Sequence, residues 1–184
     1  YEANGCQWDI LDPHQVHLAE PSLRNDGSVL GGAWTEDDWM GDIHKFCNEL
    51  TAVLKNKYGV KFSFGNTILD AKNLDYYDAI VISSGVGSTA LAKTVGDTID
   101  VYPVKGYSIT VNLDDESYKH APKTSLLDDQ EKIVTSTLGR RFRVAGTAEL
   151  TGENYDIRRD RIEPLLEWVH TNFPKINTHD YSSW

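Results

Sequence analysis

A lysine and a tyrosine two residues apart are the strongest candidates for chemistry in this sequence. Lys105 and Tyr107 lie in the stretch Tyr-Pro-Val-Lys-Gly-Tyr at 102–107. Residues two apart in a strand share a face, and Gly106 between them permits another group to approach closely. A cation and a phenol aimed into a cleft could hold an anionic substrate or stabilise developing charge. The periodicity equally allows an edge lysine beside a packed tyrosine.

A glycine-rich turn is the second candidate. Residues 85–90, Gly-Val-Gly-Ser-Thr-Ala, fit the loose G-x-G-x-x-G/A phosphate fingerprint. A complete fingerprint would continue with a second parallel strand that ends in an acidic residue about 20 positions on. Because an antiparallel pattern follows instead, we interpret Ser84 and Gly85 as part of a tight turn near a cofactor. Ser84 is not read as a hydrolase nucleophile, since Ile82 and Val86 stand where that motif needs glycines.

The sequence offers little for a metal. His14, His17 and Glu20 follow one another on a short predicted helix, and no second group of ligands is apparent. We therefore expect no metal site. Cys6 and Cys47 are far apart and form no C-x-x-C pair, and Cys47 lies on the apolar side of a predicted helix, where we expect a buried thiol.

Residues 41–97 have the alternation of an α/β layer. Apolar side chains recur at helical spacing from 42 to 57 and predict one buried helical stripe. Val60, Phe62 and Phe64 alternate as a strand, and 67–69 continue as extended chain. The apolar run 78–83 is typical of a strand covered on both faces, and a short helix is predicted from 89 to about 95.

From residue 98 onward the pattern changes to an antiparallel sheet. The stretches 101–111, 133–138 and 141–150 alternate and are joined by turns, with a hairpin at 138–140. Helices flank this sheet at 13–20, where Asp12 and Gln15 can form a capping box, and around 162–173. We expect a polar loop at 114–123. Four residues of the third stretch share one phase, which we interpret as a solvated face: Arg141, Arg143, Thr147 and Glu149.

Charge and hydropathy exclude some classes of partner. The chain has 184 residues and a formal net charge of −10, whereas a phosphate backbone requires a basic surface, so we expect no nucleic-acid partner. No apolar run approaches the roughly 20 residues that span a bilayer. We expect no membrane-spanning segment and a cytoplasmic location, with peripheral attachment to a membrane left open.

Three ordered segments give the sequence a specific resemblance. They are GGAWTEDDWMGDIHKF at 31–46, VYPVKGYSITV at 101–111 and APKTSLLDDQEKIVTSTLGRRFRVAGTAELTG at 121–152. Together they resemble D-amino-acid dehydrogenases of the small-subunit type, within the FAD-dependent amine oxidoreductases that include D-amino-acid, glycine and sarcosine oxidases. Tyr107 favours the dehydrogenase branch, because the oxidases usually carry a glutamine there.

The resemblance implies an α/β (α+β) fold with three parts. Residues 1–40 would lead into the substrate domain, 41–97 would form part of an FAD-binding layer, and 98–184 would form the antiparallel substrate domain. It also implies site residues: Ile68 at the adenine end of FAD, Ser84 and Gly85 at a turn near the cofactor, and Lys105 and Tyr107 where the substrate sheet faces the flavin.

The resemblance further implies an activity and partners. A D-amino acid would be oxidised to a 2-oxo acid and ammonia, and the remainder of the flavoenzyme would be a partner. The family's amino-terminal G-x-G-x-x-G strand is not found in this sequence, and the arginine that grips the substrate carboxylate is expected just beyond Trp184. We therefore expect the 184-residue chain to be inactive alone. Two alternatives stay open: a glycine, sarcosine or cyclic imino acid substrate, and a non-catalytic binding module that lacks the flavin site.

Overall fold

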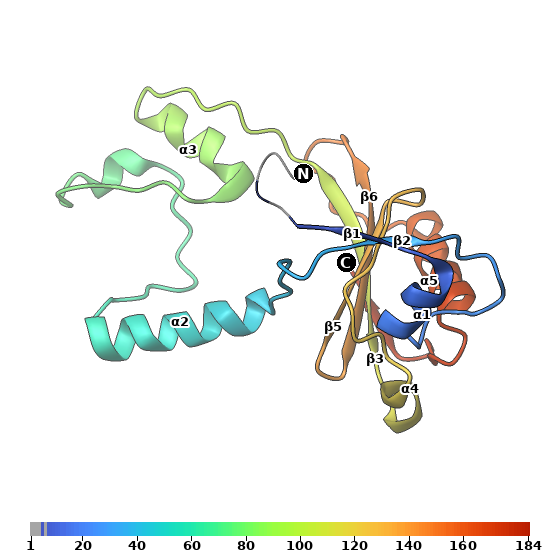
Figure 1. Cartoon of the computed structure of the whole chain (residues 1–184). Helices are drawn as coiled ribbons and strands as arrows, with labels where there is room; N and C mark the ends of the chain where they lie inside the picture. Colours follow the sequence, from blue (N-terminus) through green and yellow to red (C-terminus); the bar gives the residue numbers. More distant parts are fainter. Residues whose placement is uncertain (1–4, 6) are drawn as a thin grey trace. The chain divides into compact units, whose positions relative to one another are not determined.

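The computed structural model describes residue 5 and residues 7–184, which form two compact units (Figure 1). Unit 1 contains the described residues up to 43, together with 106–149 and 155–184. Unit 2 contains 44–105 and 150–154. The chain passes between the units after residues 43, 105, 149 and 154.

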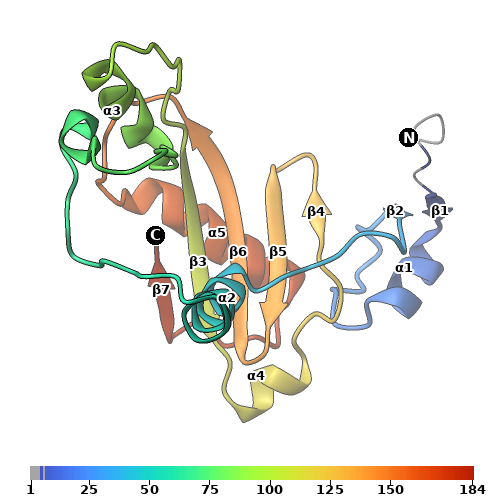
Figure 2. The same ribbon diagram turned by 90° about the vertical axis from the view of Figure 1, so that its left-hand side faces the viewer.

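A five-stranded sheet forms the centre of unit 1 (Figure 2). Its strands run in the order β4-β5-β6-β3-β7, and the pairs β4–β5, β5–β6 and β3–β7 are antiparallel. The bounds of these strands are Lys105–Asn112 for β3, Leu127–Asp128 for β4, Ile133–Leu138 for β5, Arg141–Glu149 for β6 and Tyr181–Ser183 for β7.

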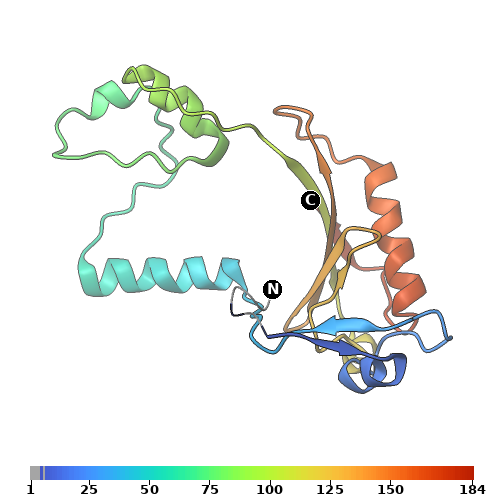
Figure 3. The same cartoon turned by 45° about the horizontal axis from the view of Figure 1, so that its top comes forward.

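Helix α5, Arg159–Asn172, covers one face of this sheet (Figure 3). Its apolar side chains repeat every three to four residues, so one side of the helix can bury them against the alternate residues of the strands. The core they form is contiguous, and its most completely buried large apolar side chains are Tyr107, Ile109, Val111, Phe142, Val144, Leu165, Val169 and Phe173.

Unit 1 also contains a separate two-stranded antiparallel sheet. Strands β1, Asp9–Leu11, and β2, Gly32–Trp34, flank helix α1, Pro13–Ala19. The predicted capping box is confirmed: Gln15 N donates to Asp12 Oδ1 at 2.8 Å, and Asp12 N donates to Gln15 Oε1 at 2.9 Å. Gly31 has a φ of 154°, and a Cβ there would lie 2.8 Å from the Leu11 carbonyl oxygen, so this turn requires glycine.

Unit 2 is built from helices and turns. Helix α2, Ile43–Tyr58, starts at the unit boundary, and helix α3, Ser88–Thr94, packs against the short turn Ala71–Leu74. Ala71 N donates to Thr94 Oγ1 at 3.0 Å, which joins these two elements.

The predicted strands of the 41–97 region are wrong at the level of secondary structure. Residues 60–64 and 78–83 form no strand in the described chain, and Val81 is 86% exposed. A strand needs a neighbour to satisfy its backbone hydrogen bonds, and the described part of unit 2 supplies none. The predicted burial of α2 and of Cys47 is also not found, because Phe46 and Cys47 are exposed.

One predicted loop is a helix. Residues 114–123 contain α4, Asp115–Lys119, capped by Asp114, whose Oδ1 accepts from Ser117 N at 2.7 Å. The mixed fold class, with helices and antiparallel sheets, is confirmed.

Candidate active site

The site region is the end of the unit 1 sheet at which β3 begins and β6 ends. Tyr107 on β3 is 2% exposed and points to the face covered by α5, where Ile109 and Val111 also lie. Its hydroxyl donates to Glu149 Oε2, the last residue of β6, at 3.0 Å. A phenol that was predicted to be either packed or functional is therefore buried and hydrogen-bonded.

Two arginines hold the Glu149 carboxylate. Arg161 Nε donates to Glu149 Oε1 at 2.5 Å, and Arg158 Nη1 lies 3.6 Å from the same oxygen. The Glu149 side chain is 9% exposed. Burial raises its pKa, but the hydrogen bonds from Arg161 and Tyr107 and the two positive charges outweigh that effect, so the pKa lies below its ordinary value. The Glu149 carboxylate therefore accepts a hydrogen bond on each oxygen, from Arg161 on Oε1 and from Tyr107 on Oε2.

Backbone strain gathers at the same end of the sheet. Thr147 and Lys132 have φ values of 64° and 56°, and they are the non-glycine residues with positive φ in the described chain. The two residues lie near each other, because Gly146, which directly precedes Thr147, contacts Lys132: a Cβ on Gly146 would lie 3.4 Å from the Lys132 carbonyl oxygen. Strain of this kind is concentrated at binding and catalytic sites, particularly when a β-branched residue carries it.

The positive φ of Thr147 explains why Glu149 lies on a different face of β6 from the one that the sequence predicted. Phe142 and Val144 point to α5, so strict alternation would put Glu149 on the opposite face with Arg143. The kink at Thr147 interrupts that alternation and turns Glu149 toward Tyr107. The prediction that Glu149 lies on a solvated face is wrong. The glycine before Thr147 in a strand is the signal that could have revealed the kink.

Lys105, the first residue of β3, belongs to unit 2. Its Nζ donates to Asn154 Oδ1 at 3.2 Å, and the side chain is partly exposed. The structure therefore places Lys105 and Tyr107 two positions apart on one strand, as predicted, on either side of a unit boundary.

The predicted cofactor-binding residues are all exposed in unit 2. Ile68 is 43% exposed, and Ser84 and Gly85 stand at the turn that leads into α3. The Ser84 backbone N–H donates to Ser88 Oγ at 3.1 Å, and the two hydroxyls lie 3.3 Å apart.

Arg143, one of the four residues predicted to form a solvated face of β6, lies on the sheet face opposite α5. Arg143 Nη2 donates to Ser108 Oγ at 3.3 Å. No carboxylate of the described chain lies within ion-pair distance of Arg143, whereas Arg141 pairs with Asp42. The solvated-face prediction therefore fits Arg143, which is exposed, better than Glu149.

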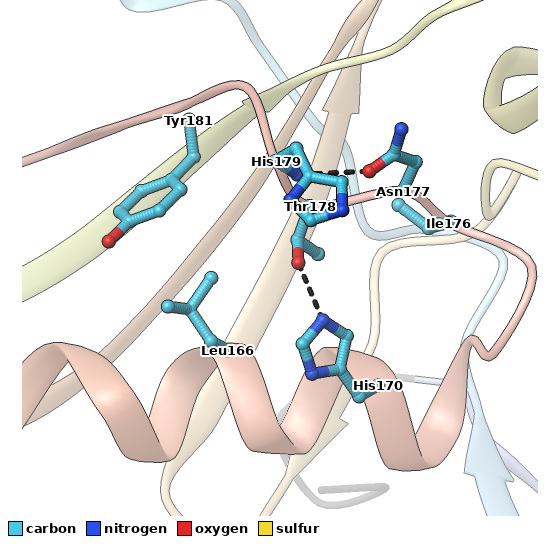
Figure 4. Close-up of a pocket in the computed structure, with 7 residues that line it drawn as sticks. All are labelled: Leu166, His170, Ile176, Asn177, Thr178, His179 and Tyr181. Atoms are coloured by element: carbon cyan, nitrogen blue, oxygen red, sulfur yellow. Dashed lines mark hydrogen bonds between the residues drawn. The ribbon is translucent and has the colours of Figure 1, made fainter.

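A separate open hollow of about 450 Å³ lies between α5 and the segment that leads into β7 (Figure 4). Its histidines are His170 and His179, and His170 Nε2 lies 2.5 Å from Thr178 Oγ1. None of the predicted site residues lines it. Within the described ranges, no group of three potential ligands could hold a metal, and no helix is long and apolar enough to cross a bilayer.

Comparison with known proteins assigns the chain to a family of oxidoreductases. A family model described as FAD dependent oxidoreductase matches residues 1–184. The chain belongs to this family. The structure is also similar to glycine oxidase from Bacillus cereus, with a TM-score of 0.65 and 16% identity over 99% of this chain and 52% of that chain, a likeness that concerns the fold.

Curated relatives narrow the comparison. The chain is 42% identical to D-amino acid dehydrogenase 3 of Mesorhizobium japonicum, over 95% of this chain and 46% of that protein. It is 37% identical to the D-amino acid dehydrogenase of Vibrio cholerae over 81% of this chain and 38% of that protein, and 34% identical to that of Rhizobium johnstonii over 99% and 46%. The chain thus spans about half the length, or less, of the curated relatives it matches.

Proposed function

We propose that this chain is the substrate-sheet portion of an FAD-dependent enzyme that deaminates D-amino acids oxidatively. The observation that carries the proposal is the 42% identity to a D-amino acid dehydrogenase across 95% of the chain, together with the family match over its whole length. A strained, polar sheet end with Tyr107 and Glu149 supports a functional site on the substrate sheet.

The chemistry supplied by FAD, when bound, is acceptance of a hydride from the substrate. An uncharged α-amine loses hydride from its α-carbon and becomes an iminium ion. Water then adds to that carbon, and ammonia and a proton leave, which gives the 2-oxo acid. The protein has to orient the substrate and control charge around the reacting carbon.

Lys105 and Tyr107 would act at the flavin-facing part of the substrate sheet. The partly exposed ammonium of Lys105 can attract an anionic substrate group or stabilise negative charge. Tyr107 is buried with its hydroxyl on Glu149, a geometry that favours a role in shaping the site over proton transfer. Both roles remain predictions.

Residues of unit 2 would contact the cofactor. Ile68, Ser84 and Gly85 are exposed, so a dinucleotide can reach their backbone groups. The apolar stripe of α2 and the strand-like segments 60–64 and 78–83 lack partners in the described chain, and these surfaces fit the remainder of the flavoenzyme, with 41–97 as part of its FAD-binding layer. A cytoplasmic location belongs to the same proposal.

Dye-linked oxidation of amino acids tests the function. The protein expressed from its complete gene should reduce an artificial electron acceptor with D-alanine and not with L-alanine. Faster turnover of glycine, sarcosine or a cyclic imino acid would transfer the proposal to another substrate of the same family. A protein that binds no flavin and reduces no acceptor would be a binding module.

A further inference from the structure

Glu149 is turned toward the core by a backbone distortion. The positive φ of Thr147 breaks the alternation of β6 two residues earlier, and bulge-like distortions of this kind re-aim side chains beside functional sites. Gly106 lies beside the same kink, since a Cβ at this position would be in ordinary contact, at 3.7 Å, with the Thr147 carbonyl oxygen. The start of β3 is therefore next to the distorted end of β6.

The Glu149 carboxylate is held more firmly than packing requires. It accepts from Arg161 on one oxygen and from Tyr107 on the other, and Arg158 adds a second positive charge. The two arginine side chains are 40% and 47% exposed, and ion pairs with solvent-exposed partners contribute little net stability. The effect of Glu149 is geometric, because the carboxylate fixes the direction in which the phenol O–H points.

We propose that Glu149 is a positioning residue for the reaction, acting through the phenol of Tyr107, with Arg161 as the group that holds it. The inference rests on the proposed function, since Tyr107 is placed at the substrate sheet by that proposal.

The contact itself can be tested in the 184-residue chain without flavin. With ¹³Cζ-labelled tyrosine, the Tyr107 signal is assigned by its disappearance in Tyr107→Phe. Glu149→Gln should shift that signal and leave the other tyrosines unchanged. Glu163→Gln is the matched control: it makes the same chemical change in an exposed pair on α5, where Arg159 Nε donates to Glu163 Oε1 at 2.6 Å.

The role is tested in the flavin-loaded protein from the complete gene. We expect Glu149→Gln to lower kcat/KM for D-alanine about tenfold, and the deuterium isotope effect with α-deuterated D-alanine to increase. A misplaced site slows hydride transfer, whereas a smaller fraction of folded enzyme lowers kcat and leaves KM and the isotope effect unchanged. In a Tyr107→Phe background, Glu149→Gln should have no further effect.

Each outcome decides the inference. A shifted Tyr107 signal with unaltered kinetics would make the contact purely structural, and an unshifted signal would remove the contact; both overturn the proposal. If Glu149→Gln does not fold, Tyr107→Phe must show the same increase in isotope effect, and an unchanged value would overturn it. A wild-type protein that oxidises no D-amino acid overturns the proposed function, and the role of Glu149 with it.

Discussion

Glu20 is a buried carboxylate that joins two distant parts of unit 1, and its removal should be costly. It is 1% exposed. Its Oε1 accepts from Ser22 N at 3.0 Å, and its Oε2 accepts from Lys123 N at 2.7 Å and from Thr124 N at 3.0 Å. The carboxylate therefore ties the end of α1 to a loop about a hundred residues later in the chain.

The magnitude follows from those three bonds. A hydrogen bond to a charged group contributes about 1.5–3 kcal/mol, so three at the lower limit give about 4.5 kcal/mol. Neighbouring bonds are not additive, and we expect Glu20→Ala to lower the free energy of unfolding by about 3–4 kcal/mol. Glu20→Gln keeps one acceptor oxygen for Lys123 and Thr124 but opposes Ser22 N–H with a second donor, which should cost about 1–2 kcal/mol.

Urea unfolding followed by tryptophan fluorescence measures these losses, because Trp168 lies in the core of unit 1. Glu167→Ala, at an exposed position of α5, is the control and should change the unfolding free energy by less than about 0.5 kcal/mol. Equal effects of Glu20→Ala and Glu167→Ala would refute the reasoning that the buried carboxylate holds the two segments together.

Three further substitutions test local features of unit 1. Asp128 accepts from Trp168 Nε1 at 2.9 Å and from two backbone N–H groups; burial raises its pKa, yet these bonds outweigh burial and lower it below 3.8. Because the pKa of Asp128 is lower in the folded than in the unfolded state, the ionised carboxylate stabilises the fold at pH values above the unfolded-state pKa, and this stabilisation is lost as the pH falls. The difference in unfolding free energy between wild type and Asp128→Asn should therefore be constant from about pH 7 to 5 and shrink below about pH 4. An equal difference at pH 3 would contradict this. Gly31→Ala should lower the unfolding free energy by more than about 1 kcal/mol in urea titrations, because its Cβ would meet the Leu11 carbonyl oxygen at 2.8 Å, and an unchanged midpoint would disprove that clash. Thr147→Gly should raise the unfolding free energy by about 1 kcal/mol, because glycine adopts the positive φ without strain. The control Thr110→Gly, in the extended part of β3, should lower the unfolding free energy by a similar amount. A lower unfolding free energy for both variants would mean that Thr147 is not strained.

Local signals in the sequence predicted much of unit 1. The capping box of α1, the hairpin between β5 and β6 and the apolar stripe of α5 depend on neighbouring residues, and each is found where expected. The interaction between Tyr107 and Glu149 was not predicted, because these residues are 42 positions apart and a single kink decides the face on which Glu149 lies.

The failures in unit 2 have one physical cause. The segments 60–64 and 78–83 have strand-like sequences, but strand formation depends on a pairing partner that the described chain does not contain. The stripe of α2 predicted the helix correctly and its burial incorrectly, since periodicity determines which side is apolar and not what covers it.

Anaerobic reduction of the bound flavin is the most direct test of the proposed function. The protein from the complete gene should purify with FAD, and D-alanine should bleach its visible absorbance without any other electron donor, while L-alanine leaves it oxidised. An absorbance that stays oxidised with D-amino acids, glycine and sarcosine alike, or a protein that carries no flavin, would contradict the account.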